Sequence, residues 1–213
     1  MIAADLKKMA VDIALIHFPV INKSGETIGS AVTNLDIHDI ARAARTFGVD
    51  EYYIITPYAD QLELVEEIIE HWQTGHGAQY NPSRKSALSL VRLVDSLEGV
   101  IEKVVDKRGR KPLLITTSAR LQENSITFTD TRRHIEAGEP VLLLFGTAHG
   151  LAPEVINKAD YTLPPIGGKT GYNHLSVRSA VSIILDRLLG VQEEKNSEIF
   201  NQIQLTSTHT KTL

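Results

Sequence analysis

The sequence predicts an α/β fold in which an open sheet of six mainly parallel strands carries helices on both faces. Six short segments are rich in branched and aromatic residues and are nearly continuously apolar, as expected of strands buried on both faces of a parallel sheet. Segments with a helical spacing of apolar residues lie between them. The two kinds of segment alternate along the chain, which is the pattern of an open, doubly wound sheet.

The predicted strands share a short length and a high content of Val, Ile, Leu, Tyr and Phe. They cover residues 11–18, 51–57, 90–96, 112–118, 141–147 and 161–166. The first predicted helix covers residues 37–47, with Asp36 expected as its N-cap. The second covers residues 60–73, where Asp60 and Glu63 have the spacing of a capping box. Further helices are expected over 97–108, 129–138, 150–158 and from Val177 to Leu188, where Gly190 closes the last one.

One domain is expected to cover residues 1–192, because the alternation is continuous up to that point. Residues 74–87 are interpreted as a long polar connection. Residues 193–213 lack a clear apolar stripe and are interpreted as a flexible C-terminal tail.

The composition excludes several classes of function. The formal net charge is −4, so any contact with a nucleic acid must depend on a local basic patch. The absence of cysteine excludes disulfides, thiolate zinc sites and cysteine nucleophiles. No cluster of carboxylates and histidines has the spacing of a metal site, and no metal is expected. The N-terminal apolar run is too short for a signal peptide and no stretch is long enough to span a membrane, so a cytoplasmic location is expected.

Three loops at the predicted carboxyl ends of strands are rich in small residues. They read "ITTSAR" (115–120), "LFGTAHGL" (144–151) and "PIGGKTGYNHLS" (165–176). Ligands of open α/β sheets bind at this edge. Small residues let a ligand approach the backbone, whose amides and carbonyls can then read an adenine edge. The three loops together therefore predict a pocket for a nucleoside cofactor.

Two other nucleotide-binding motifs are disfavoured. Gly168, Lys169 and Thr170 resemble the end of a P-loop, but Leu163 stands where that motif needs its first glycine. The G-x-G-x-x-G fingerprint is missing after the first predicted strand. Its absence argues against a Rossmann enzyme that uses a nicotinamide cofactor.

Two segments resemble motifs of a known superfamily. The segment "VLLLFGTAHGLAPEVINKADYTLPPIGGKTGYNHLSVRSAVSIILDRLLG" resembles the carboxyl-terminal motifs of the SPOUT superfamily, the α/β-knot RNA methyltransferases. The segment "DIHDIARAARTFGV" is similar to the first motif of the branch that methylates the ribose 2′-oxygen of tRNA guanosine, and Arg42 occupies the position of that motif's arginine. As a whole, residues 9–190 resemble a bacterial family of RNA methyltransferases related to the tRNA (guanine-N1)-methyltransferases.

The resemblance implies a fold, a cofactor and partners that periodicity does not reveal. It implies a C-terminal trefoil knot, a homodimer whose second subunit completes the site, and an RNA substrate, either tRNA or rRNA. The implied cofactor is S-adenosylmethionine. By motif position, the residues implied to bind it are Thr117, Ser118, Phe145, Gly146, Thr147, Gly150, Ile166, Gly171, Tyr172, Asn173, His174, Leu175 and Ser176.

Arg42 and His174 are the candidate catalytic residues. A poor nucleophile such as a ribose hydroxyl needs a base, or a positive charge beside its oxygen, and Arg42 can supply the charge. His38, Arg42 and Arg45 share one face of the first helix by their spacing. His174 stands where the 2′-oxygen branch carries an asparagine. A histidine there can accept a proton near neutral pH, so a base nitrogen is as good an acceptor as a ribose oxygen.

The candidate RNA-binding residues are scattered cations. Arg84 and Lys85 lie in the predicted polar connection near Tyr80, an aromatic residue on which an unpaired base can stack. The full set is Arg42, Arg45, Arg84, Lys85, Lys169 and Arg178, with Arg132 and Arg133 as further cations. The alternative to an enzyme is a catalytically silent knot module that binds S-adenosylmethionine or RNA and acts as a regulatory or dimerisation partner.

Overall fold

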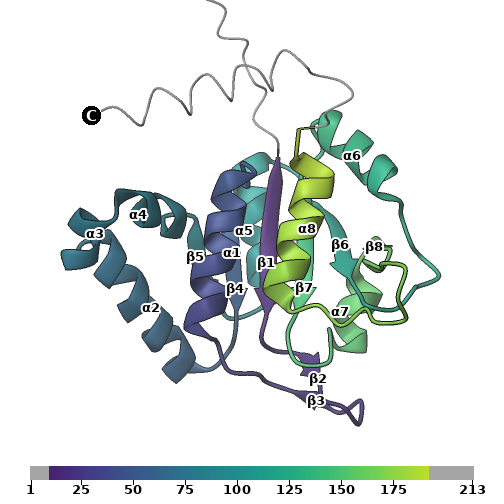
Figure 1. The fold of residues 1–213 in the computed structure, drawn as a ribbon, viewed down its shortest axis with the longest axis horizontal. Helices are drawn as coiled ribbons and strands as arrows, with labels where there is room; N and C mark the ends of the chain where they lie inside the picture. The colour runs from purple at the N-terminus through teal and green to yellow at the C-terminus, as the bar shows by residue number, and fades with distance from the viewer. Residues whose placement is uncertain (1–9, 192–213) are drawn as a thin grey trace, which may run out of the picture.

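The computed structural model describes residues 10–191 and has the predicted α/β architecture, a twisted central sheet between two layers of helices (Figure 1). The sheet has six strands in the order β5-β4-β1-β7-β6-β8, and every neighbouring pair is parallel. The strands are β1 (Val11–Ile16), β4 (Tyr52–Ile55), β5 (Val91–Val94), β6 (Leu113–Thr117), β7 (Val141–Gly146) and β8 (Tyr161–Leu163). All six predicted strands are confirmed. The predicted tail at 193–213 lies outside the described residues.

Helices cover both faces of the sheet because residues along the central strand alternate between two cores. Ile13 and Leu15 of β1 belong to a core with α1, α2, α4, α6 and α8, whereas Ala14 and Ile16 belong to a core with α5 and α7. The helices are α1 (Asn34–Thr46), α2 (Ala59–Gln73), α3 (His76–Tyr80), α4 (Pro82–Leu88), α5 (Leu97–Arg108), α6 (Phe128–Glu136), α7 (Pro153–Lys158) and α8 (Val177–Leu189).

The segment 74–87 is not a polar connection, and that prediction was wrong. It folds into two short helices, α3 and α4. Asn81 caps α4, because its side-chain oxygen accepts a hydrogen bond from the Arg84 amide at 3.0 Å, and Pro82 occupies the first turn. Ala87 and Leu88, at the end of α4, are buried in the core that includes α1.

Two predicted helix caps were also wrong. The N-cap of α1 is Thr33, whose hydroxyl accepts from the Asp36 amide at 3.2 Å, and Asp36 lies in the first turn. Helix α2 begins after Tyr58, without a side-chain cap, so Asp60 and Glu63 do not form a capping box.

Helix α7 begins at Pro153 instead of residue 150, because residues 147–152 form a turn after β7. Gly190 does end α8, although its φ is −65°. A glycine is needed there because a Cβ would lie 2.4 Å from the Asp186 carbonyl oxygen.

A small hairpin between β1 and α1 was not predicted. Its strands, β2 (Val20–Ile21) and β3 (Thr27–Ile28), pair antiparallel around a turn in which Gly25 has a φ of +83°. The hairpin projects at the bottom of Figure 1, at the edge where the parallel strands end. It therefore stands beside the loops that were predicted to form the cofactor pocket.

An ion-pair network joins the opposite edge of the sheet to the end of α5. Asp12 of β1 is buried and receives hydrogen bonds from Lys107 at 2.9 Å and Arg108 at 3.2 Å. Arg108 also pairs with Asp50. Burial raises the pKa of Asp12, while the two cations act in the opposite direction. The network fixes the amino-terminal edge and leaves the carboxyl-terminal edge open for a site.

After β8, at the edge of the sheet, the chain returns to the centre of one face. Helix α8 packs beside α1 and over the middle strands (Figure 1). Among the described residues, no helix has the length and apolar character that a membrane crossing requires.

Candidate functional site

The three strands that precede the predicted cofactor loops are neighbours in the sheet, in the order β7-β6-β8. Their carboxyl ends therefore meet at one edge, and the loops after them share one region. The Thr117 hydroxyl at the end of β6 donates to the Leu144 carbonyl of β7 at 3.1 Å, which ties two of the loop bases together. Ser118 follows at the surface and accepts from the Arg120 amide at 3.0 Å.

The loop after β7 is a tight turn with unusual backbone angles. The Gly150 amide donates to the Thr147 carbonyl at 3.0 Å, Ala148 has a φ of +52°, and Gly150 has a φ of +120°. A side chain at Gly146 would place its Cβ 2.8 Å from the Leu151 nitrogen. The side chain of Phe145 is buried in the sheet, so only the backbone of this residue borders the carboxyl edge. The turn thus presents glycine and backbone atoms, as a close approach by a ligand requires.

The loop after β8 leaves its backbone almost entirely unpaired. Within the described chain, residues 164–175 form no backbone–backbone hydrogen bond. The amide and carbonyl of Tyr172 contact the Thr170 hydroxyl at 3.4 and 3.5 Å, and the Asn173 side chain donates to the Ala119 carbonyl at 2.9 Å. The last contact ties this loop to the loop after β6. The remaining amides and carbonyls, from Ile166 through Gly171, are available to a ligand.

The end of this loop leads into α8 and contains the candidate base His174. Ser176 is the N-cap of α8, and its hydroxyl accepts from the Ser179 amide at 3.2 Å. His174 is exposed, and its ring lies 5.4 Å from that of Tyr172 in an edge-on arrangement. Tyr172 and Leu175 are also exposed, so the loop offers apolar as well as polar groups to a ligand.

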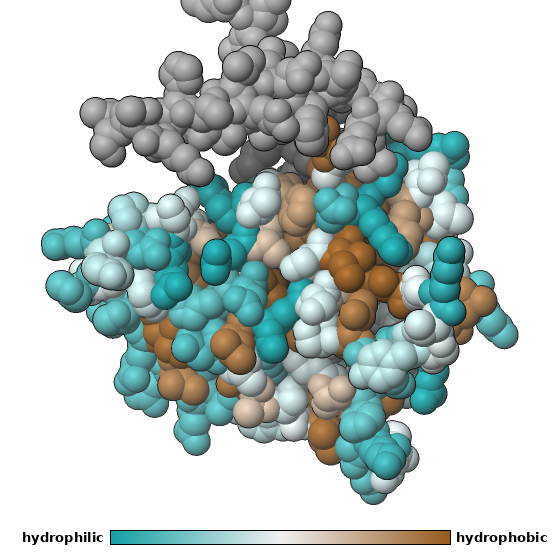
Figure 2. All heavy atoms as spheres, viewed as in Figure 1, coloured by the Kyte–Doolittle hydropathy of each residue, from teal (hydrophilic) through white to brown (hydrophobic). Residues whose placement is uncertain are grey.

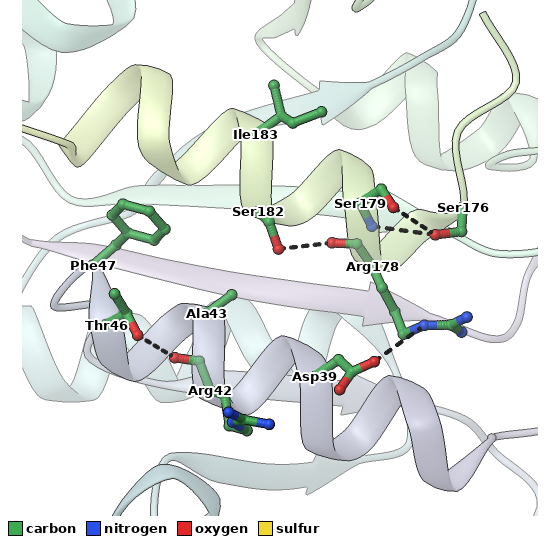
Figure 3. Close-up of a pocket in the computed structure, with 10 residues that line it drawn as sticks. All are labelled: Asp39, Arg42, Ala43, Thr46, Phe47, Ser176, Arg178, Ser179, Ser182 and Ile183. Carbon is green, nitrogen blue, oxygen red and sulfur yellow. Dashed lines mark hydrogen bonds and ion pairs between the residues drawn. The ribbon is translucent and has the colours of Figure 1, made fainter.

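Arg42 lies in a groove between α1 and α8, which has a volume of about 660 Å³ (Figure 3). Phe47 and Ile183 contribute apolar surface to the groove, and Ser176 lies at one end of it. The side chain of Arg42 makes no hydrogen bond or ion pair with any other residue in the described part of the chain. Its charge is therefore available to a substrate or a partner.

Arg178 lies in the same groove but is held by two carboxylates of α1. Its Nη1 donates to buried Asp36 at 2.7 Å, and its Nε lies 3.4 Å from Asp39. The Thr33 hydroxyl also donates to Asp36, at 2.6 Å. Arg178 thus joins the start of α8 to the start of α1.

The other predicted RNA-binding residues are dispersed. Lys169 is exposed on the loop after β8, whereas Arg45 is in the last turn of α1. The guanidinium of Arg84 lies 4.5 Å from the Trp72 ring centroid, and Lys85 is on α4. Figure 1 places α3 and α4 far from the β2–β3 hairpin that marks the carboxyl edge of the sheet.

Two further predicted cations are held by contacts within the fold. Arg132 donates to the Arg187 carbonyl at 3.0 Å, and Arg133 pairs with Asp130 at 2.8 Å. The ring centroids of His38 and Trp72 lie 5.6 Å apart, and His38 does not line the groove that contains Arg42.

Sequence reasoning missed His17, Ser30 and the hairpin beside the site. His17 is fully buried at the end of β1, and its Nδ1 lies 3.1 Å from the Ser30 hydroxyl. Burial lowers the pKa of His17, and the nearby Asp36 carboxylate opposes that shift only in part. In the sequence His17 reads as part of an apolar strand. The "NKSGE" turn was the signal for the hairpin, but strands of two residues give no alternating pattern.

Comparison with known proteins gives the site its context. Residues 10–190 match the sequence model of a family described as SAM-dependent RNA methyltransferase. The chain is 49% identical over 177 residues, 83% of its length, to a tRNA (guanine-N(1)-)-methyltransferase of Oleidesulfovibrio alaskensis, of which it spans 41%. It is 43% identical over 84% of its length to an uncharacterized protein of Aquifex aeolicus, of which the match covers 87%.

Among solved structures, the chain resembles a TrmH/SpoU tRNA modifying enzyme of A. aeolicus. The TM-score is 0.52 with 18% sequence identity, and the match covers 96% of this chain and 90% of that one. At this identity the likeness concerns the fold alone. It agrees with the predicted α/β architecture.

Proposed function

The chain belongs to the family of SAM-dependent RNA methyltransferases, and we propose that it methylates a nucleotide of tRNA with S-adenosylmethionine bound by the loops after β6, β7 and β8. The curated relative from O. alaskensis carries a tRNA methyltransferase name, which favours tRNA over rRNA. This chain spans about two fifths of that relative, and nucleoside analysis of the methylated tRNA determines the acceptor atom. A guanine N1 and a ribose 2′-oxygen are the two candidates.

One observation supports the cofactor site above all: the unpaired backbone of residues 164–175, at the same edge of the sheet as the glycine turn at 146–150. Unpaired backbone groups are costly unless water or a ligand satisfies them. A purine edge needs a set of donors and acceptors at close range, and this backbone offers both. The donor set therefore suits an adenosine cofactor. The residues proposed to hold it are those that the motif resemblance indicated, from Thr117 and Ser118 through Phe145, Gly146, Thr147 and Gly150 to Ile166 and Gly171–Ser176.

Bound there, S-adenosylmethionine supplies an electrophilic methyl group on a sulfonium centre. The chain's own residues have two tasks, which are to hold the acceptor in line and to manage its proton. We assign the placement of positive charge beside the acceptor to Arg42, whose guanidinium is unpaired within the described chain. Proton acceptance is assigned to His174, which is exposed at the loop before α8. Lys169, on the same loop, is assigned a phosphate contact.

A homodimer and a trefoil knot are parts of the same proposal. The groove between α1 and α8 combines Arg42 with apolar Phe47 and Ile183, and Figure 2 shows a hydrophobic patch on the outer face of α8. A second copy that covers this groove would bring its own cofactor loops to Arg42. The return of α8 from the sheet edge to the sheet centre supports the knot, because the chain must pass the loops after β6 and β7 on the way.

The knot is tested by pulling the protein from residues 10 and 190 in a single-molecule force experiment. An unknotted chain extends by about 3.3–3.6 Å per residue when it unfolds. A tightened knot retains several residues and shortens the final length by a fixed amount. Extension to the full length would contradict the knot.

The cofactor site is tested by calorimetric titration with S-adenosylmethionine, with ATP as the control ligand. We expect about one cofactor per subunit and no binding of ATP. Transfer of a radiolabelled methyl group to undermodified tRNA, followed by nucleoside analysis, then identifies the acceptor atom. A protein that binds the cofactor but labels no RNA would favour the silent knot module.

A further inference from the structure

A hydrogen-bonded chain of three side chains leads from buried His17 to the loop after β7. The His17 Nδ1 lies 3.1 Å from the Ser30 hydroxyl, which lies 2.5 Å from the Thr147 hydroxyl. The Thr147 hydroxyl in turn lies 3.1 Å from the Ile16 carbonyl oxygen. These residues come from the end of β1, from the segment before α1 and from the loop that borders the proposed cofactor.

The chain of contacts fixes the direction of each hydrogen bond. A carbonyl oxygen can only accept, so the Thr147 hydroxyl donates to Ile16. Thr147 then accepts from the Ser30 hydroxyl, because its own single hydroxyl hydrogen is directed at the Ile16 carbonyl. In this arrangement Ser30 accepts from His17, and the ring carries its proton on Nδ1. The neutral ring agrees with the direction in which burial moves the pKa of His17. Its Nε2 is buried and has no hydrogen-bond partner within residues 10–191.

The β2–β3 hairpin holds the same loop through its backbone. The Ile21 amide donates to the Gly150 carbonyl at 2.9 Å, and the His149 amide donates to the Ile21 carbonyl at 3.0 Å. At the base of the hairpin, the Ser30 amide donates to the His17 carbonyl at 2.8 Å. His17 and Ser30 thus close the hairpin whose strand pairs with the loop.

The loop needs such support because its turn is strained. Ala148 has a φ of +52°, a conformation that costs a residue with a Cβ about 1 kcal/mol or more. Neither neighbour of Ala148 can relax freely, because Thr147 is anchored through its hydroxyl and His149 through its amide. The turn is therefore held in one conformation before any ligand arrives, which lowers the entropic cost of binding.

We propose that His17 is a positioning residue for the cofactor, which acts through Ser30 and Thr147 to fix the loop of residues 146–150. The inference rests on the proposed function in one respect, namely that this loop borders S-adenosylmethionine. His17 touches neither the cofactor nor the RNA in this assignment. Its contribution is the hydrogen bond between Nδ1 and the Ser30 hydroxyl, which helps to hold the base of the β2–β3 hairpin closed.

Two substitutions of His17 separate the donor from the bulk of the ring. The amide of an asparagine reaches the position of Nδ1, whereas the amide of a glutamine reaches that of Nε2. We expect His17→Gln to raise the dissociation constant for S-adenosylmethionine about tenfold, the effect of one lost hydrogen bond. His17→Asn should stay within about threefold of the wild type. In steady-state assays the loss should appear in KM for the cofactor more than in kcat.

Ser30→Ala provides a second, independent break in the chain. It should weaken cofactor binding as His17→Gln does, and the double variant should bind no more weakly than either single variant, because the relay is already interrupted. Thermal unfolding is recorded for each variant, so that cofactor affinities are compared only at temperatures where every variant is folded. Equal cofactor affinity in His17→Asn and His17→Gln, or additive losses in the double variant, would overturn the inference alone. Failure of the wild type to bind the cofactor would overturn the proposed function, and the inference with it.

Discussion

Arg42 is the residue on which the proposed chemistry depends most directly. We expect Arg42→Ala to lower kcat by about 100-fold or more, because it removes a charge placed beside the developing negative charge of the acceptor. Affinity for S-adenosylmethionine, measured by calorimetry, should change little. Arg45→Ala is the matched control, because Arg45 carries the same charge on the same helix but lies in its last turn, outside the groove. Equal losses of kcat in the two variants would show that Arg42 contributes only to the overall positive potential around the RNA, and not to charge placed beside the acceptor.

His17 also predicts how stability depends on pH. Burial lowers the pKa of His17 below the 6.5 of a free histidine, so below pH 6.5 the unfolded chain binds a proton that the folded protein does not. Stability must therefore fall as the pH drops from 6.5 toward 5, by at most about 1.4 kcal/mol per pH unit for one proton. The effect is measured as the free energy of urea unfolding across that range.

The comparison with His17→Asn isolates this group. The shift of His38 has the same direction as that of His17, and the raised pKa of Asp12 acts in the opposite direction, but both are common to the two proteins. The wild type should show the steeper fall. Parallel curves for the two proteins would mean that His17 titrates normally when folded.

At the scale of the elements, Arg178 connects the helix that carries Arg42 to the loop that is proposed to hold the cofactor. Its partner Asp36 is buried, so removal of the cation leaves a buried carboxylate with one fewer hydrogen bond. We expect Arg178→Met to lower the free energy of unfolding by about 1–3 kcal/mol. Arg133→Met is the control, because its ion pair with Asp130 is exposed and should contribute about 0–0.5 kcal/mol.

Denaturant unfolding of the two variants measures this difference. Since Arg178 is partly exposed, solvent screens part of the interaction, and the lower end of the range is the firmer expectation. A loss in Arg178→Met no larger than that in Arg133→Met would mean that the bridge does not hold the two helices together. Arg178 would then be free for the RNA contact that its position in the sequence suggested.

Some elements of the fold could be predicted from the sequence alone, and others could not. The six strands were predictable because strands such as β7 (Val141–Gly146) are buried on both faces and read as nearly unbroken apolar runs. The helices α3 and α4 were not, since they are short and polar and are held by an Asn81 cap and by contacts with α1 and α2 that only the folded chain provides. The loops that we propose to bind the cofactor were predicted by the rule that places ligands at strand ends. The hydrogen-bonded chain of His17, Ser30 and Thr147 joins side chains that lie 13 and 117 positions apart in the sequence, and no local sequence pattern marks it.

At the scale of the whole molecule, charge and shape bear on how RNA is bound. The net charge is −4, and the exposed face of α2 carries Glu63, Glu66, Glu67 and Glu70. The predicted cations do not form one patch on the subunit, because Lys169 lies on the loop after β8 at the carboxyl edge while Arg84 and Lys85 lie on α4, which packs against α1. A continuous basic surface would require a second subunit, which makes the proposed dimer a condition of RNA binding as well as of catalysis.

Subunit complementation tests that condition. Arg42→Ala leaves the cofactor loops intact, and Gly171→Trp blocks them in the proposed site, where a Cβ at Gly171 meets no atom within 4 Å and the fold can accept a side chain. Each variant alone should be inactive. If Arg42 serves the cofactor of the other subunit, mixed dimers hold one complete site, and an equimolar mixture after subunit exchange should recover about a quarter of the wild-type activity.

The outcome separates two arrangements that a single subunit cannot distinguish. If Arg42 acted within its own subunit, every mixed dimer would contain one site without the arginine and one without the cofactor, and the mixture would remain inactive. Native mass spectrometry of the same samples, which resolves the two variants by mass, confirms that mixed dimers form. Ile183→Asp, placed in the groove, should prevent both dimerisation and recovery. Recovery that survives Ile183→Asp would show that the subunits meet elsewhere. The groove between α1 and α8 would then be open to the RNA itself.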